Sequence, residues 1–247
     1  MHVFLDLWGV LTDSRKMVLA YRRRVAQLLS TRHGGSEDAW MRAHDVAGAW
    51  YSDNLKEPET WSRGTWLEVV NRADSENLLR MFREVGIAPP QDPLAAARAL
   101  EFEVVSTIDS AFPDARPAVS RLKREGHQVY VTTNATESNA RGSLHGARLL
   151  SELDDVFTGE RLNAGKATPE YWSGVRNAVS VNASRAVVVD DRLDYLGAAA
   201  TGEFVTLLLD RGGRYSADAI PPSVRAILRN LAGLPHFVDV LDKGGNV

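Results

Sequence analysis

Four short segments of the chain carry side chains that could act together on an anionic substrate. A short apolar run ends at Asp6, and Thr133 and Asn134 follow a β-branched run. Lys166 comes just before a helix signal, and a run of valines ends at Asp190. Short apolar runs are typical of buried strands, and the carboxyl ends of parallel strands meet at one edge of a sheet. That edge would hold a nucleophilic carboxylate, a hydroxyl, a cation and acids suited to a hard metal ion, which is the chemistry of covalent catalysis.

The elements that must position these side chains follow from the hydrophobic pattern. Residues 15–106 show only helical spacing, as in Trp66, Val69, Val70 and Ala73. The rest of the chain alternates between strand and helix signals, which favours a parallel sheet with helices on both faces. Besides the run that ends at Asp6, strands are predicted at 129–132, 186–190 and 204–209, and helices at 117–125, 169–179, 196–201 and 224–231.

This pattern predicts two structural units. Residues 1–14 and 109–247 form a Rossmann-like α/β core, and residues 15–108 form an all-helical unit inserted after the first strand. An insertion of this length should be packed in its own right, because so long a structureless loop is improbable within a compact domain.

The composition narrows the classes of function. The chain has 247 residues, a net charge of -3 and no cysteine. The charge gives no reason to expect nucleic acid or an anionic membrane as a partner, and the absence of cysteine excludes disulfides and thiolate catalysis. We find no apolar stretch long enough for a membrane span and no signal-peptide pattern. We therefore expect a soluble cytoplasmic protein that acts on a small molecule; the composition sets no oligomeric state.

Taken together and in order, the four segments resemble the four motifs of the haloacid dehalogenase (HAD) superfamily. The segment from Asp6 to Ser14 is similar to the Asp-x-Asp-Gly-Thr-Leu-x-Asp-Ser motif of its phosphatases. The segment from Thr168 to Trp172 is similar to the continuation of the third motif, and the helical insertion lies where the family has its helical cap. The resemblance covers nearly the whole chain and implies a HAD-like core with a cap domain.

The resemblance also implies roles for individual residues. Asp6 matches the nucleophile, Thr133 the hydroxyl that binds the transferring group, and Lys166 the lysine that steadies the charge of nucleophile and substrate. It further implies a Mg²⁺ site, whose ligands would be Asp6, the backbone carbonyl of Trp8, Asp190 and Asp194. Substrate contacts are expected from Trp8, Asn134 and Trp172.

Trp8 is the main departure from the phosphatase pattern. Phosphatases of the family carry an aspartate there, which protonates the leaving oxygen and then activates water. An indole nitrogen is only a neutral donor, and general acid–base catalysis is worth roughly 10²–10⁴-fold in rate. A magnesium-dependent phosphatase or phosphotransferase with Trp8 should therefore act on a good leaving group, such as an acyl or aryl phosphate.

Two other interpretations stay open. The dehalogenase branch of the family carries tyrosine where Trp8 stands, has a Ser-Asn pair that Thr133-Asn134 resembles, and releases a halide that needs no proton. That branch, however, has a neutral residue where Asp190 stands, and its cap arginine signature has no match near residues 32–42. A third interpretation is a protein of this fold with little turnover that acts by binding. We favour the phosphatase, because the acid at Asp190 has its best use with a metal.

Aromatic residues crowd the helical insertion. Ordinary packing is the favoured explanation, because tryptophan serves cores well, but an aromatic-walled pocket is the alternative. If even one or two of these rings face the cleft, the substrate should be more apolar than a sugar phosphate. The residues are Trp40, Trp50, Tyr51, Trp61 and Trp66.

Overall fold

A six-stranded parallel sheet forms the centre of the molecule. The computed structural model describes residues 1–180 and 185–244. The strand order is β3-β2-β1-β4-β5-β6, and every neighbouring pair is parallel. This confirms the predicted Rossmann-like α/β class. The strands are β1 (His2–Asp6), β2 (Gln128–Thr133), β3 (Asp155–Thr158), β4 (Ala186–Asp190), β5 (Val205–Leu209) and β6 (Val224–Leu228).

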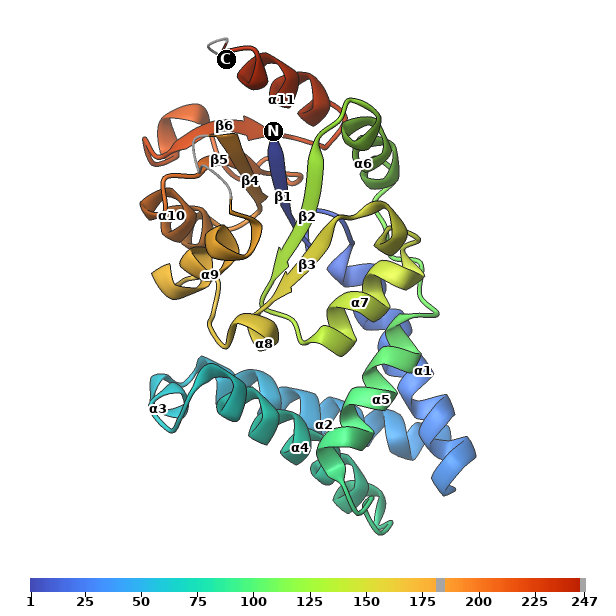
Figure 1. Cartoon of the computed structure of the whole chain (residues 1–247). Helices are drawn as coiled ribbons and strands as arrows, with labels where there is room; N and C mark the ends of the chain where they lie inside the picture. Colours follow the sequence, from blue (N-terminus) through green and yellow to red (C-terminus); the bar gives the residue numbers. More distant parts are fainter. Residues whose placement is uncertain (181–184, 245–247) are drawn as a thin grey trace.

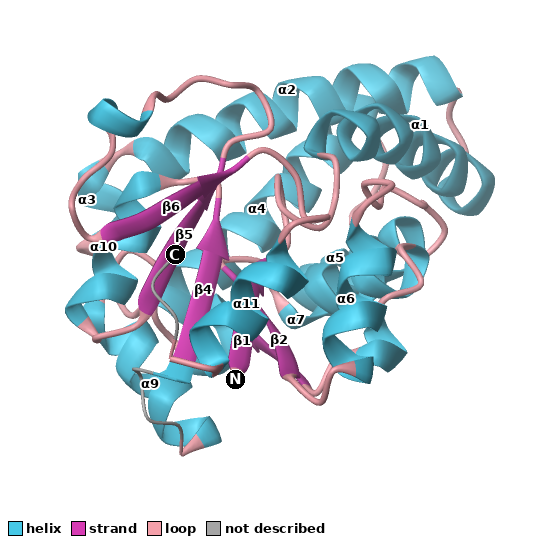
Figure 2. Ribbon diagram, turned by 90° about the horizontal axis from the view of Figure 1, so that it is seen from above, coloured by secondary structure: helices cyan, strands magenta, loops and turns pink. Residues whose placement is uncertain are grey.

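Helices cover both faces of the sheet (Figure 2). Alternate residues of β1 serve opposite faces: Val3 and Leu5 pack in one buried cluster and Phe4 in the other. Helices α6, α7 and α11 pack on the first face, and α9 and α10 pack on the second. Their bounds are α6 (Ala115–Arg124), α7 (Glu137–Gly146), α8 (Gly159–Leu162), α9 (Pro169–Val179), α10 (Leu193–Thr201) and α11 (Leu234–Asp242).

A group of helices lies between β1 and α6 and is called here the helical insertion (Ser14–Val105). It lies against the carboxyl edge of the sheet (Figure 1) and has a hydrophobic cluster of its own, centred on Trp40 and Phe82. That it is an independent domain with the limits 15–108 stays a prediction. Within the described residues, none of the helices is both long and apolar enough to span a bilayer. The insertion comprises α1 (Ser14–His33), α2 (Glu37–Lys56), α3 (Pro58–Trp61), α4 (Trp66–Val85) and α5 (Pro93–Val105).

The sequence interpretation is wrong at the end of the chain. The helix predicted at 224–231 is instead the edge strand β6, which pairs with β5, and the last helix begins at Leu234. Val224, Ile227 and Leu228 suit either structure, and a short apolar run does not distinguish a strand from a helix by spacing alone.

Two further elements, β3 and α7, carry weak sequence signals and were not predicted. Strand β3 has only four residues, and α7 buries small or polar groups such as Gly142 and Ser143.

Candidate active site

The carboxyl ends of β1, β2 and β4 lie side by side and carry the acidic and hydroxyl side chains. Asp6 ends β1, Thr133 ends β2 and Asp190 ends β4. β1 pairs with both of the other strands, so it is the central one of the three. The three strands are almost entirely buried at these ends, which fixes the direction of each side chain.

Lys166 joins two of these strand ends. Its ammonium donates hydrogen bonds to Asp6 Oδ1 at 2.6 Å, to Asp190 Oδ2 at 2.5 Å and to the Thr132 carbonyl at 3.0 Å. The lysine is fully buried. Burial alone lowers the pKa of an ammonium group, but the charges of Asp190 and Asp6 outweigh this effect and raise the pKa of Lys166. The lysine therefore stays a cation at every physiological pH.

The carboxylates around Lys166 carry more negative charge than the lysine neutralises. Asp6, Asp190 and Asp191 each present an oxygen within 4.8 Å of the others. Burial, opposed by Lys166 and reinforced by Asp190, raises the pKa of Asp6 to about 7. Burial and the charge of Asp190 likewise raise the pKa of Asp191. The raised pKa values of Asp6 and Asp191 mark a site whose negative charge a bound cation would offset.

The donor set fits a hard divalent ion. When all three acids are ionised, they outnumber the nearby cations, which are Lys166 and, 4.0 Å from Asp191, the Arg214 guanidinium. All the donor atoms of the acids are oxygens. The sequence analysis did not predict Asp191 as a member of this group. The structure does not bring Asp194 to this group: its carboxylate pairs with Arg192 at 2.7 Å, and this hydrogen bond lowers the pKa of Asp194. The backbone carbonyl of Trp8 stays a predicted ligand.

A glycine turn lets Asp191 approach the loop after β1. Gly9 has a φ of +89°, in the left-handed region, and a Cβ at this position would lie 2.5 Å from Asp191 Oδ2. The loop is closed by Thr12, whose backbone N–H and hydroxyl both donate to the Leu7 carbonyl. Glycine at this position therefore serves both the turn and the acidic group.

Thr133 and Asn134 line the cavity above the acids, but their polar atoms are partly engaged. The Asn134 carbonyl oxygen accepts from the Lys166 backbone N–H at 2.7 Å, and its amide donates to the Tyr195 hydroxyl at 2.9 Å. The backbone N–H of Thr133 donates to the Tyr171 hydroxyl at 2.9 Å. Asn134 thus holds the loop that carries Lys166. Tyr195, which sequence reasoning missed, places its ring 5.1 Å from the Lys166 ammonium.

The structure does not bring Trp172 to the cavity. Its side chain is 1% exposed and packs in the core against Tyr171 and Phe204. Its indole N–H donates to the Lys166 carbonyl at 2.8 Å. Trp172 therefore supports the loop that carries Lys166 and does not line the cavity.

A cavity of about 730 Å³ lies between the strand ends and the helical insertion. Asp6, Thr133 and Asp191 lie at its core end, and Trp8 lines it while packing against the hydrophobic clusters of both units. Its volume is in the range of small-molecule sites.

Some aromatic residues of the insertion pack in its core, and others line the cavity. Trp40 is buried in the insertion's core, and Trp50 packs under the Arg80 guanidinium. The other three, Tyr51, Trp61 and Trp66, line the cavity, so packing does not account for the whole group.

The helical insertion also closes on the loops of the core. Trp66 covers Gly159 so tightly that a Cβ there would overlap the indole, and a Cβ at Gly165, next to Lys166, would lie 3.5 Å from the same ring. Beside it, the Asn163 side chain accepts from the backbone N–H of Leu67 at 2.8 Å.

Comparison with known proteins identifies a family and two similar proteins. The model of the haloacid dehalogenase-like hydrolase family matches residues 1–202. Phosphatase MT3486 of Mycobacterium tuberculosis is 31% identical over 81% of this chain and 90% of its own length. (S)-2-haloacid dehalogenase 4A of Burkholderia cepacia is 26% identical over 42% of this chain and 45% of its own length.

Among solved structures, the 2-haloacid dehalogenase of Pseudomonas syringae superposes with a TM-score of 0.68, at 18% identity, over 99% of this chain and 100% of that chain. This likeness supports the fold. The family match over residues 1–202 leads to one conclusion: the chain belongs to the haloacid dehalogenase-like hydrolases.

Proposed function

We propose that this hydrolase is a magnesium-dependent phosphatase or phosphotransferase that acts on a small molecule with a good leaving group. The observation that carries the proposal is the acidic group of Asp6, Asp190 and Asp191. When all three acids are ionised, the group keeps an excess of negative charge even after Lys166 and Arg214, which lies 4.0 Å from Asp191, are counted. A halide displacement needs no such surplus, whereas a phosphoryl group brings further negative charge that a cation must offset. The phosphatase relative, which is similar over most of this chain, supports the same direction.

Asp6 is the residue that would attack. Its carboxylate faces the cavity, and Lys166 holds Oδ1 in a fixed direction. An oxygen of Asp6 forms a bond to phosphorus while the bond to the leaving oxygen breaks, and water later hydrolyses the aspartyl phosphate. Thr133 would bind the phosphoryl oxygens from the neighbouring strand.

The metal would lie between the strand ends. The proposed ligands are Asp6, Asp190, Asp191 and the backbone carbonyl of Trp8. When bound, Mg²⁺ would favour the ionised form of Asp6 and offset the charge of the phosphoryl oxygens.

Trp8 defines the leaving group. It stands where a general acid is needed, and its indole cannot supply a proton at neutral pH. The leaving oxygen must therefore depart unassisted, which an acyl or aryl phosphate allows. The helical insertion would act as the cap that excludes water from this step.

Dehalogenation is the second candidate, because Trp8 is a bulky aromatic residue as in that branch and a dehalogenase is among the relatives. A panel separates the candidates: acetyl phosphate, p-nitrophenyl phosphate, glycerol 3-phosphate and 2-chloropropionate, each with and without Mg²⁺. We expect magnesium-dependent phosphate release from the first two only. Halide release without metal would select the dehalogenase, and silence across the panel would select a binding role. Asp6→Asn serves as the control for contaminating hydrolases.

A further inference from the structure

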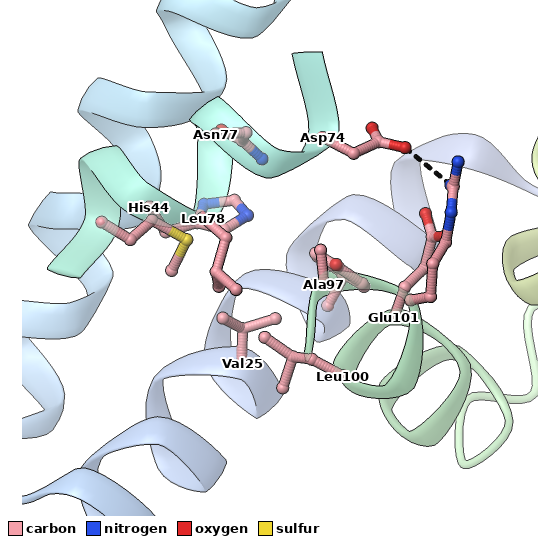
Figure 3. A pocket seen from close by; sticks show the side chains of 11 residues that line it. Val25, His44, Asp74, Asn77, Leu78, Ala97, Leu100 and Glu101 are labelled. Atoms are coloured by element: carbon pink, nitrogen blue, oxygen red, sulfur yellow. Dashed lines mark ion pairs between the residues drawn. The ribbon is translucent and has the colours of Figure 1, made fainter. Parts of the chain in front are cut away.

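The far end of the cavity enters the helical insertion and is polar. A small side cavity of about 60 Å³ opens there between α1, α2, α4 and α5, and five of its lining residues also line the large cavity. Figure 3 shows Asp74 and Glu101 at one end of this space. We call this end the inner subsite; the shared residues are Tyr21, His44, Asp74, Asn77 and Glu101.

The inner subsite carries excess negative charge. The Arg98 guanidinium lies 2.6 Å from Asp74, 3.7 Å from Glu101 and 3.9 Å from Glu160. One cation therefore faces three carboxylates among the described residues. Burial, together with the charges of Glu101 and Glu160, raises the pKa of Asp74 to about 6 even though Arg98 opposes the shift. The potential at Asp74 is thus negative and only partly compensated.

Glu101 is held in place by the core, so its charge is a fixed part of the site. Its carboxylate accepts from the Thr136 hydroxyl at 2.7 Å and from the Asn139 amide at 2.9 Å. Asp74 has no such anchor in the core. It pairs with Arg98 at 2.6 Å, is hydrogen-bonded to Tyr51 and lines both cavities, so it is the carboxylate placed to meet a ligand.

The remaining groups of the inner subsite suit a ligand that has N–H donors at one end and an apolar body. The Asn77 side-chain oxygen is buried and accepts no hydrogen bond from the described residues. Tyr21 lines the inner subsite, Tyr51 lines the adjoining large cavity, and aromatic faces attract cations. Buried acceptors without partners are costly, so a ligand with N–H groups would relieve this one.

We propose that the inner subsite binds an amine at the end of the substrate opposite to the scissile group. Asp74 would pair with the ammonium, Glu101 would add fixed negative charge, and the Asn77 oxygen would accept one N–H. The amine site does not depend on the proposed function; only the phosphoryl group at the other end of the substrate does. If both hold, the substrate would be a phosphorylated amine with an apolar or aromatic body between its two ends.

The test uses three probes of one shape and no phosphate. Phenethylamine, 2-phenylethanol and 3-phenylpropionate are titrated into the full chain by calorimetry. We expect the amine to bind at least about tenfold more tightly than the alcohol, as one charge-assisted hydrogen bond allows, and the carboxylate to bind weakest. Because no turnover is needed, the result is independent of the substrate panel that tests the phosphatase.

Variants locate the effect. Asp74→Asn should abolish the preference for the amine, whereas Glu84→Gln, the same change of charge on the exposed side of α4, should keep it. Asn77→Asp should tighten amine binding and decides the question if Asp74→Asn does not fold. Equal binding of the three probes, no binding of any of them, or an amine preference that survives Asp74→Asn would each overturn the proposal.

Discussion

Two regions of this hydrolase place three carboxylates around a central cation, Lys166 in one and Arg98 in the other, and they do so differently. Around Lys166 the cation is fully buried and binds two acids at 2.6 Å or less. Around Arg98 the cation is 15% exposed, and two of its three acidic contacts lie beyond 3.5 Å. The compact group suits a fixed catalytic charge. The looser group leaves charge uncompensated at the cavity wall, where a ligand can supply the missing cation.

The largest expected effect comes from Asp6→Asn, which separates the two regions. Turnover of any substrate found in the panel should fall by at least about 10⁴-fold, since an amide is not a competent nucleophile. Phenethylamine binding at the inner subsite should be unchanged. Product assays and calorimetry on the same preparation check both statements. Residual activity above background would mean that Asp6 is not the nucleophile.

Trp8→Asp tests whether the region around Lys166 lacks only a general acid. Restoring a carboxylic acid at this position should raise the rate on glycerol 3-phosphate by about 10²-fold, within the range of general acid catalysis, and should change p-nitrophenyl phosphate little. Initial rates with saturating Mg²⁺ measure the contrast. A uniform gain on both esters would show that the tryptophan limits access to the site and not proton transfer.

The incompletely compensated charge of Asp74 should also make the free energy of unfolding depend on pH. The pKa of Asp74 is about 6 in the fold against 3.8 for a free aspartate. Between about pH 4 and 6, Asp74 is therefore protonated in the folded chain and ionised in the unfolded chain. The free energy of unfolding should fall as pH rises through this range. Between pH 4.5 and 7.5 this contribution is on the order of 2 kcal/mol.

Urea unfolding of the wild type and Asp74→Asn at both pH values isolates that contribution. The variant should lack it, while Glu84→Gln should retain it. Identical pH profiles for wild type and Asp74→Asn would indicate that Arg98 neutralises Asp74 completely, and the contrast between the two regions would then disappear.

The smallest expected effect concerns the contact that joins the regions. In Gly159→Ala the new methyl group should displace Trp66, at a cost of about 1–2 kcal/mol in stability, and should weaken amine binding by loosening the cavity. Gly197→Ala is the matched control, because nothing lies within 4 Å of a Cβ there. Thermal unfolding and calorimetry measure both. Equal behaviour of the two variants would mean that the insertion does not rest on Trp66.

The parts of the molecule that could be predicted from sequence are those fixed by local pattern. The strands that carry Asp6 and Asp190 are continuous apolar runs, and each ends in an acid of the candidate site. The edge strand β6 escaped prediction because its spacing suits a helix equally well, and pairing with β5 decided its structure. Local pattern likewise could not distinguish Asp191 from Asp194, since which of them meets Asp6 depends on how the loop turns after β4.

The inner subsite could not be predicted at all. Asp74 and Arg98 meet through the packing of α4 against α5 within the insertion, and Glu160 on α8 joins them only because the insertion docks on the core. Trp172 shows the opposite limit: its place in the sequence suggested the cleft, but α9 turns its indole into the core.

The burial of Lys166 has a practical consequence for labelling the protein. Amine reagents attack a lysine that is both neutral and exposed. Lys166 is neither, because it is fully buried and its pKa is raised. The other lysines are exposed or partly exposed: Lys16, Lys56, Lys123 and Lys243. Labelling with amine-reactive dyes or biotin, or coupling to a surface through amines, should therefore modify the exposed lysines. The charge of Lys166 at the strand ends should stay intact.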